Sequence, residues 1–293
     1  MKITHLCFAD DLLLFAKGDC PSVQAMMECL KQFSAASGLQ ANMGESCIYF
    51  GGVSQQERLS ILQSTSFSYG ELPFKNLEVP LSTKKISIIQ WQPLILKIVC
   101  QNFLLDLKKA LLCCRAQLMQ SVLFGVQAYR AQLFVLPAKV IKLIDSYCRS
   151  YLWSASNTIT KKALIAWTRV CSPVCFGGIN LTNIGLWNRA AIAKIHRALA
   201  NKEDRLWIRW VHTYYIQGQP FESIRVPQRA CWMIRKIIEA RSSLNQFQCS
   251  NTCGKSLIRQ LYLQLLDSVP RVMWKNLTYQ NAARPKARFT FWL

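Results

Sequence analysis

The sequence has few acidic residues and no long apolar run, and both shortages narrow its possible functions. Asp and Glu number 15 against 36 Lys and Arg, so the formal net charge is +21 at pH 7. The longest run without a charged residue, 170–188, contains Pro173, Gly177 and Gly178, which break a helix. A membrane-spanning helix needs roughly 20 consecutive apolar residues. We therefore expect no membrane span.

The sequence also lacks the motifs of several other classes of protein. There is no Walker-type Gly-Lys-Ser, no dinucleotide-binding GxGxxG, and no spacing that suggests a Ser–His–Asp triad. The pairs Cys171/Cys175 and Cys249/Cys253 have no second Cys or His pair at the distance that a zinc site requires. Acidic residues come too early in the chain for a signal peptide. We expect no zinc site in this chain, and the 13 cysteines suggest thiols in a reducing compartment.

The charges that are present are unevenly distributed along a chain that can form a core. Hydrophobic residues make up 51% of the sequence, which argues against a mainly disordered protein. Residues 1–72 hold four basic and seven acidic side chains, a net charge of −3, whereas residues 73–293 hold 32 and eight, a net charge of +24. This pattern suggests a cation-binding site beside a polyanion-binding surface. The alternative is a solvated basic surface that only keeps the protein soluble.

The amino-terminal segment predicts a small α+β fragment. Residues 3–8 and 12–16 are apolar runs on either side of Ala9-Asp10-Asp11, a pattern typical of a β-hairpin with the acids at its tip. Residues 20–38 have apolar side chains at helical spacing and end in Gly38, a favoured helix cap. A strand is predicted at Cys47–Phe50. We expect one helix to cover one face of a small sheet.

From about residue 85 onward, the patterns predict helices. The expected helices are Ile95–Leu112, 116–135, Lys139–Trp153, Trp187–Ala200 and Trp232–Ser243, with an irregular loop or a short hairpin over 173–183. The same part of the chain holds several tryptophans. We expect them to pack in helix cores rather than stack on nucleic acid bases, and they are Trp153, Trp167, Trp187, Trp207 and Trp210.

The adjacent acids Asp10 and Asp11 have two interpretations. Asp favours turns because its side chain bonds its own backbone, so a turn alone explains the pair. Alternatively, the two carboxylates bind Mg²⁺, which prefers oxygen ligands. In two-metal nucleotidyl transfer, such ions activate the attacking hydroxyl group and stabilise the leaving oxygen. Another carboxylate must then complete the site.

The order of the motifs favours the second interpretation. HLCFADDLLLF (5–15) closely resembles the Phe/Tyr-x-Asp-Asp hairpin of reverse transcriptases, and GLQANMGESCIYFGGV (38–53) resembles the segment that follows it in non-LTR (LINE-type) retrotransposons. Further similar segments follow in the same order at 72–85, 114–141, 148–153, 167–194 and 273–293. Since this series covers nearly the whole chain, the sequence is similar to a LINE-type RNA-directed DNA polymerase.

The resemblance implies a part of the right-handed polymerase fold. The expected fold is an α+β palm remnant of hairpin, helix and strand, followed by a mainly α-helical thumb and connection region. The implied domains are a partial palm with the FADD hairpin at 1–72, a thumb at 73–160, a connection region at 161–272 and the truncated start of a zinc-binding module at 273–293. Asp10 and Asp11 correspond to the catalytic Mg²⁺ ligands of the palm.

The same resemblance implies an RNA/DNA primer–template as partner and a nuclear location. Basic side chains of the thumb suit phosphate contacts that do not depend on base sequence. The candidates for these contacts are Lys84, Lys85, Lys108, Lys109, Arg115, Lys139, Lys142 and Arg149. For each one, a solvated helix face is the alternative.

The resemblance also implies that catalytic parts are missing. In the family, the fingers and a further metal-binding Asp precede the hairpin, whereas here Met1 stands a few residues before it. Among the nearest acids, Asp19, Glu28 and Glu45, none is convincingly placed as a substitute. We therefore expect the isolated chain to be inactive, unless a partner chain supplies the missing palm. The alternatives are a non-catalytic nucleic-acid-binding fragment and a non-functional retroelement relic.

Overall fold

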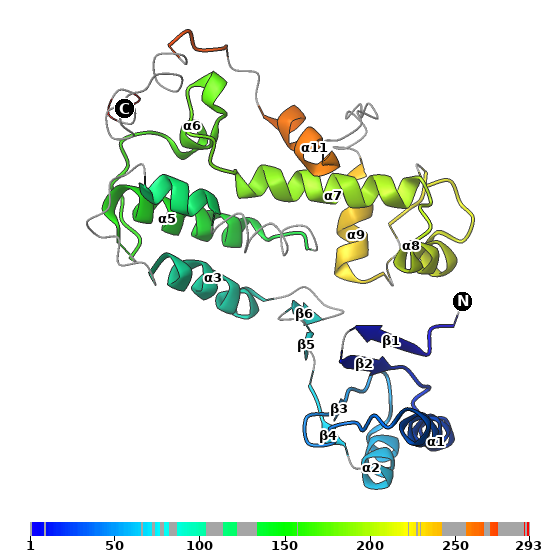
Figure 1. Cartoon of the computed structure of the whole chain (residues 1–293). Helices are drawn as coiled ribbons and strands as arrows, with labels where there is room; N and C mark the ends of the chain where they lie inside the picture. The colour runs from blue at the N-terminus through cyan, green and yellow to red at the C-terminus, as the bar shows by residue number, and fades with distance from the viewer. Residues whose placement is uncertain are drawn as a thin grey trace. The chain divides into compact units, whose positions relative to one another are not determined.

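The computed structural model contains two compact units, Met1–Ser82 and Thr83–Leu293, which are described separately. The first combines short strands with two helices, and the second is helical (Figure 1). The expected α+β fragment followed by helices is thus confirmed. The domain boundaries predicted after residues 72, 160 and 272 stay predictions. The structure describes residues 2–8, 10–65, 67–71, 74–76, 79–81, 87–103, 114–121, 134–156, 158–221, 223–226, 228, 230–241, 256–266, 270–274, 290 and 292.

The first unit begins with the predicted hairpin. Strands β1 (His5–Phe8) and β2 (Asp11–Leu14) pair antiparallel, with Phe8 opposite Asp11. The backbone N–H of Phe15 donates to the carbonyl oxygen of Thr4 at 2.8 Å and extends the ladder. Because the connection between Phe8 and Asp11 is so short, it fixes the register of every residue in the two strands.

The first helix, α1 (Cys20–Ser37), confirms the prediction for residues 20–38. Asp19 caps its first turn, where its carboxylate accepts a hydrogen bond from the backbone N–H of Ser22 at 2.9 Å. Pro21 lies in the first turn, where its missing N–H has no cost. The helix ends at Gly38, whose φ of 73° lies in the left-handed region that glycine adopts without strain.

A second helix, α2 (Gln55–Ser64), packs against α1. Ser54 caps its first turn: the backbone N–H of Glu57 donates to Ser54 Oγ, and Ser54 Oγ donates to the Glu57 carboxylate at 2.8 Å. Among the described side chains of this unit, the buried ones are Val23 of α1 and Ile61 of α2. The first unit therefore has a small core.

The strands of the first unit form separate pairs. Strand β3 (Cys47–Ile48) lies parallel to β4 (Ser68–Tyr69), and β5 (Phe74–Asn76) is antiparallel to β6 (Val79–Leu81). We expected the strand at Cys47 to join a small sheet with the hairpin. This expectation was wrong for the described residues, in which β3 and the hairpin belong to different sheets. The pairing of β3 depends on a strand about 20 residues further along the chain, and local patterns do not encode such a partner.

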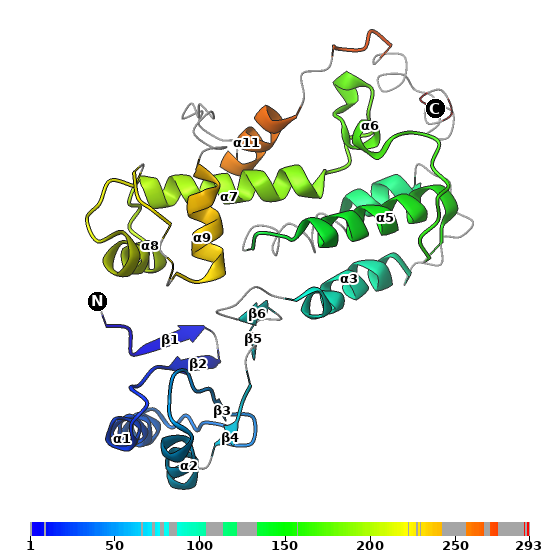
Figure 2. The same ribbon diagram turned by 180° about the vertical axis from the view of Figure 1, so that it is seen from behind.

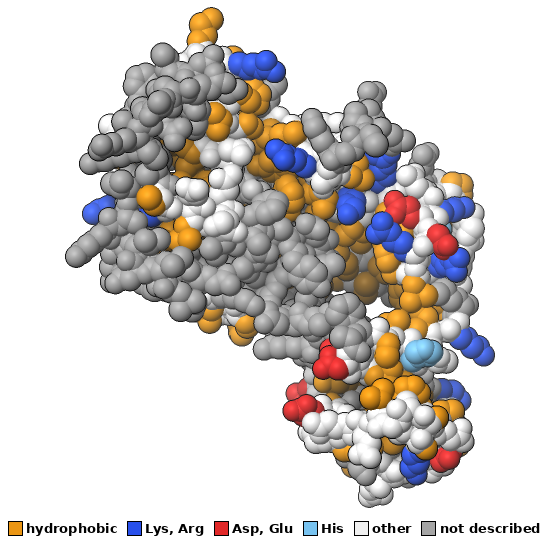
Figure 3. Space-filling view, viewed as in Figure 1, with side chains coloured by type: hydrophobic (Ala, Val, Ile, Leu, Met, Phe, Trp, Pro, Cys, Tyr) orange, Lys and Arg blue, Asp and Glu red, His pale blue; other side chains and the backbone are white. Residues whose placement is uncertain are grey.

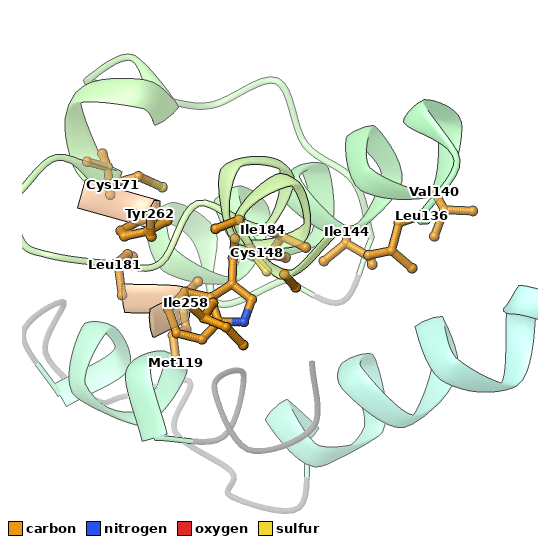
Figure 4. Packing of buried hydrophobic residues seen from close by; sticks show 14 of the residues in the cluster. Met119, Leu136, Val140, Ile144, Cys148, Cys171, Leu181, Ile184, Ile258 and Tyr262 are labelled. Carbon is orange, nitrogen blue, oxygen red and sulfur yellow. The ribbon is translucent and has the colours of Figure 1, made fainter. Parts of the chain in front are cut away.

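The core of the helical unit lies between α3 (Ile88–Phe103), α5 (Ala138–Ser154), α7 (Ile184–Ala200) and α11 (Leu257–Leu265). Figures 1 and 2 show α3 along α5 and α11 against α7. In Figure 4, Ile258 and Tyr262 of α11 lie close to Leu181, Ile184 and Cys148. One apolar cluster therefore joins the four helices.

The sequence predicted α5 well and α3 less well. In α5, Val140, Ile144 and Tyr151 are buried, as their helical spacing predicted. Helix α3 begins at Ile88 rather than at the predicted Ile95, and Pro93 lies within it. Proline normally interrupts a helix, so a helix that continues through this residue is hard to predict from the sequence. Residues 104–113 and 122–133 of the predicted helices lie outside the described residues.

The predicted loop at 173–183 is confirmed. It follows α6 (Trp167–Cys171) and contains a 3₁₀ turn, η1 (Val174–Phe176). Residues near the carboxyl end pack against it: the backbone N–H of Val272 donates to Cys175 O at 3.0 Å, and the indole N–H of Trp292 donates to Gly177 O at 2.7 Å. Gly178 cannot carry a side chain, because a Cβ atom would lie 2.0 Å from the Ser172 carbonyl oxygen.

A second apolar cluster lies at the end of α7. It includes residues of α8 (Leu206–Val211), of the π-helix η2 (His212–Ile216) and of α9 (Trp232–Glu239). The guanidinium group of Arg241 donates to the carbonyl oxygens of Phe221 and Ile224 and thereby holds the loop before α9. The helix predicted at Trp232–Ser243 is confirmed as far as Glu239, and residues 242 and 243 lie outside the described residues.

A buried amide fixes the segment before α5 to α7. Asn188 accepts a hydrogen bond from the backbone N–H of Leu136 at 3.0 Å and donates one to the carbonyl oxygen of Phe134 at 2.6 Å. Within the described part of the chain, Asn188 is the partner that the structure gives to both of these backbone groups. Asn188 thus satisfies one donor and one acceptor at a place where no helix or sheet ladder does so.

We predict that Asn188→Leu destabilises the helical unit. Leucine has a similar volume but leaves the N–H of Leu136 and the carbonyl of Phe134 unpaired, at about 1–3 kcal/mol for each buried group. Urea unfolding followed by circular dichroism should therefore show a loss of about 2–4 kcal/mol. Gln92→Leu, at an exposed position of α3, is the matched control. Equal stability of the two variants would contradict this role of Asn188.

Candidate metal pair and basic surface

The hairpin places Asp10 and Asp11 side by side at its end. Asp10 lies in the turn, and Asp11 is the first residue of β2. Both side chains are exposed, so a cation or a phosphate could reach them. Their carboxylate oxygens have the chemistry that Mg²⁺ prefers. The structure thus shows the position at the tip that we predicted, and the role of the two residues as metal ligands stays a prediction.

The neighbouring acids do not join this pair. Asp19 caps α1 and forms an ion pair with Lys17 at 2.8 Å. Its hydrogen bonds with Lys17 and Ser22 lower its pKa to about 2. Glu28 is exposed on α1, and Glu45 is exposed in a loop. Within the described residues, no group of three or more His, Cys, Asp or Glu side chains could hold a metal ion. The pair therefore fits only part of a magnesium site, and no catalytic step through a metal follows from this geometry.

The two units carry charge of opposite sign. The first holds five Lys and Arg against eight Asp and Glu, a net charge of −3. The helical unit holds 31 Lys and Arg against seven Asp and Glu, a net charge of +24. Figure 3 shows this excess of basic side chains on the face of the helical unit that is turned to the viewer. The helical unit is thus the part of the chain that would attract a polyanion.

Most described carboxylates of the helical unit are paired with cations. Glu203 lies 2.9 Å from Arg205, Asp204 lies 2.6 Å from Arg209, and Glu239 contacts Lys236. These side chains are largely exposed, and exposed ion pairs contribute little to stability. The remaining basic side chains outnumber them, so the surface keeps a positive potential.

The predicted phosphate contacts fall into three groups. Lys139 and Lys142 are exposed on α5, three residues apart, so they lie on one side of the helix. Arg115 and Arg149 are partly buried: Arg115 donates to the carbonyl oxygen of Leu152 at 3.1 Å, and Arg149 to Ser146 Oγ at 3.3 Å. Lys84, Lys85, Lys108 and Lys109 lie outside the described residues. All eight assignments stay predictions.

The sequence analysis missed one unusual acid, Asp145. It lies on α5 next to the buried residue Ile144, and one of its carboxylate oxygens is shielded from solvent without a hydrogen-bond partner. Burial raises its pKa to about 6, against the smaller opposing effects of the Trp167 indole N–H and Arg149. Its position beside the apolar stripe of α5 was the signal that could have revealed it.

The prediction that tryptophans pack in the core holds only in part. Trp187 is buried between the helices of the first cluster, and Trp153, Trp167 and Trp210 are partly buried. Trp207 of α8 is 36% exposed, so the expectation was wrong for this residue. A helical apolar pattern does not reveal which side of a short helix faces solvent.

Comparisons with known proteins give one informative similarity. Over 118 residues, which are 40% of this chain, the sequence is 26% identical to a protein of Arabidopsis thaliana with the name "Putative ribonuclease H protein". The matched segment spans only 19% of the plant protein. No family model matches the chain. No helix in the described part of the structure is long and apolar enough to cross a membrane.

We predict that Asp145→Asn stabilises the protein in a pH-dependent way. The pKa of Asp145 is raised in the folded state, so the unfolded chain ionises first as the pH rises above 3.8. The resulting penalty on folding is complete above about pH 6 and absent below the unfolded pKa. Unfolding in urea should show a gain of up to about 3 kcal/mol near pH 8 that shrinks towards pH 4.

The control for this change is Asp204→Asn, which removes an exposed acid that is paired with Arg209. It should change the free energy of unfolding by less than about 1 kcal/mol at either pH. A gain for Asp145→Asn that is equal at both pH values would show that burial of the charge is not its cause.

Proposed function

We propose that this chain is part of a LINE-type RNA-directed DNA polymerase and that its helical unit binds the primer–template duplex. The observation that carries the proposal is the separation of charge, with +24 on the helical unit and −3 on the unit of the hairpin. A duplex carries one negative charge per about 1.7 Å of its axis, and Lys and Arg side chains that neutralise phosphates release bound counterions. Exposed residues such as Lys139 and Lys142 suit this role.

The plant relative supports nucleic acid as the ligand. Its name describes a ribonuclease H protein, and a ribonuclease acts on a nucleic acid. The sequence resemblance narrows this class to a retrotransposon reverse transcriptase. A nuclear location follows from the same proposal, because elements of this type are copied at chromosomal targets.

In this proposal, the hairpin provides two ligands of the catalytic Mg²⁺ ions. Asp10 and Asp11 are exposed at the turn, where ions bound to a substrate triphosphate could reach them. The resemblance assigns the third carboxylate to a palm segment that precedes the hairpin in the family. A longer polypeptide or a partner chain must then supply it. The 293 residues by themselves would bind nucleic acid without extending a primer.

We predict salt-sensitive binding of duplexes that does not depend on base sequence. Replacing Lys139 and Lys142 with Ala should weaken binding and make the slope of log K against log salt shallower by about 2, one for each lost phosphate contact. Fluorescence anisotropy with labelled duplexes of two unrelated sequences, titrated at several salt concentrations, measures both effects.

The matched control removes two exposed cations from the other unit, in Lys2→Ala with Lys31→Ala. This variant loses the same charge, so a general electrostatic effect would weaken binding equally. Equal losses in the two variants would contradict a contact through α5. Binding unaffected by salt would contradict the proposal as a whole.

We also predict the result of a primer-extension assay. The purified chain, given a primed RNA template, deoxynucleotides and Mg²⁺ or Mn²⁺, should produce no extended primer, because two carboxylates do not complete a two-metal site. Duplex binding in the same samples should be unchanged in Asp10→Ala. Template-dependent extension that Asp10→Ala abolishes would show that the chain is active on its own.

A further inference from the structure

Helix α8 and the π-helix η2 that continues it present an exposed row of aromatic rings. Ile208, Val211 and Ile216 point into the second apolar cluster and are buried. Among the aromatic residues of the same stretch, Trp207 is 36% exposed and Tyr214 is 47% exposed. Other residues already fill the buried side of the helix, whereas these large rings face solvent. They are therefore not needed to fill the core.

The π-helix explains the position of the tyrosines. In a regular α-helix, the residue four positions after Val211 would return to the buried side. Here the interval is five residues, and Ile216 takes the buried position. The wider turn keeps Tyr214 exposed and leaves Tyr215 only partly buried. Such single turns of π-helix often occur at functional sites.

Trp210 contacts both tyrosines of the row. Its ring centroid lies 5.6 Å from that of Tyr214 and 5.3 Å from that of Tyr215. Trp210 is itself partly buried against the second cluster, which restricts its rotation. Trp207 lies one turn earlier on the same side of the helix, at the i, i+3 spacing. The result is a row of rings with a fixed centre and exposed ends.

Cations flank these rings. Arg205 caps α8, and Arg209 lies between Trp207 and Trp210 in the sequence. Their side chains are 53% and 64% exposed. Each is paired with a carboxylate at the surface, and such exposed pairs are weak enough for a phosphate to replace the carboxylate. The surrounding helical unit carries a net charge of +24.

We propose that Trp207, Trp210 and Tyr214 form a stacking site for the bases of a single-stranded nucleic acid, with phosphates near Arg205 and Arg209. The inference rests on the proposed function, from which it takes nucleic acid as the ligand, and it adds a separate binding site for that ligand. Aromatic rings bind unpaired bases whatever their identity, because every base has a flat π face. Arginine supports the same contact through its planar cation.

The positive charge of the helical unit favours a single-stranded nucleic acid at this site over an apolar surface of a partner protein. An apolar partner surface would have to bury the ion pairs of Arg205 and Arg209 beside the rings, and taking an ion pair out of water is costly. A duplex does not offer its base faces, since they are stacked on each other. A single strand presents both unpaired bases and phosphates, which match the rings and the arginines.

The test compares a single strand with a duplex on the full chain. The probes are a labelled oligothymidylate of about 16 nucleotides, which forms no duplex, and a random-sequence duplex. Trp207→Ala combined with Tyr214→Ala should weaken binding of the oligothymidylate by about 10- to 100-fold. Binding of the duplex should change by less than about threefold, because its phosphates contact other residues.

Two controls separate stacking from folding. Trp207→Phe combined with Tyr214→Phe keeps a ring at each position and should restore most of the affinity. Leu206→Ala removes an exposed apolar side chain from the same helix and should leave binding of both probes unchanged. Circular dichroism of each variant checks that the helices are intact.

The outcomes distinguish this inference from the proposed function. If the double alanine variant binds the oligothymidylate like the original chain, the stacking site is wrong. The proposal that the helical unit binds a duplex would still stand. If both probes lose affinity equally in a folded variant, the rings are not specific for single strands and the inference also fails. If the original chain binds neither probe, both proposals are overturned.

Discussion

The helical unit depends on the burial of α7. This helix contributes Ile184, Trp187 and Ala190 to the first apolar cluster and Ile192 and Leu199 to the second. A helix that is apolar on several sides is stable only when other elements surround it. Helices α5 and α11 cover one part of α7, and α9 covers another. The positions of the basic residues on α5 and of the rings on α8 follow from this arrangement.

The two units also differ in the sign of their net charge. The small unit holds more acids than bases, whereas the helical unit has few carboxylates and pairs most of the described ones with arginine or lysine. Exposed pairs of this kind do little for the fold. The excess of positive charge therefore serves no evident structural purpose, which is why a polyanionic partner is the natural explanation for it.

The sequence predicted those elements that local chemistry determines. The hairpin follows from the acids between two apolar runs, α1 from Pro21 and Gly38, and α5 from its apolar spacing. It did not predict the partner of β3, which lies far along the chain. It also missed the shielded carboxylate of Asp145 and the exposure of Trp207, since each depends on how helices pack. For the candidate site, only the place of Asp10 and Asp11 could be predicted, because a turn is a local structure.

The π turn also makes the end of α8 sensitive to chain length. Because one extra residue separates Val211 from Ile216, deleting a single residue between them would turn this stretch into an ordinary helix. The apolar side would still meet the second cluster, with the isoleucine four residues after Val211. If His212 or Thr213 were the residue lost, the two tyrosines would follow Trp210 at the i, i+3 and i, i+4 spacings of an ordinary helix. The spacing of the rings would thus change while the buried side of the helix kept its partners.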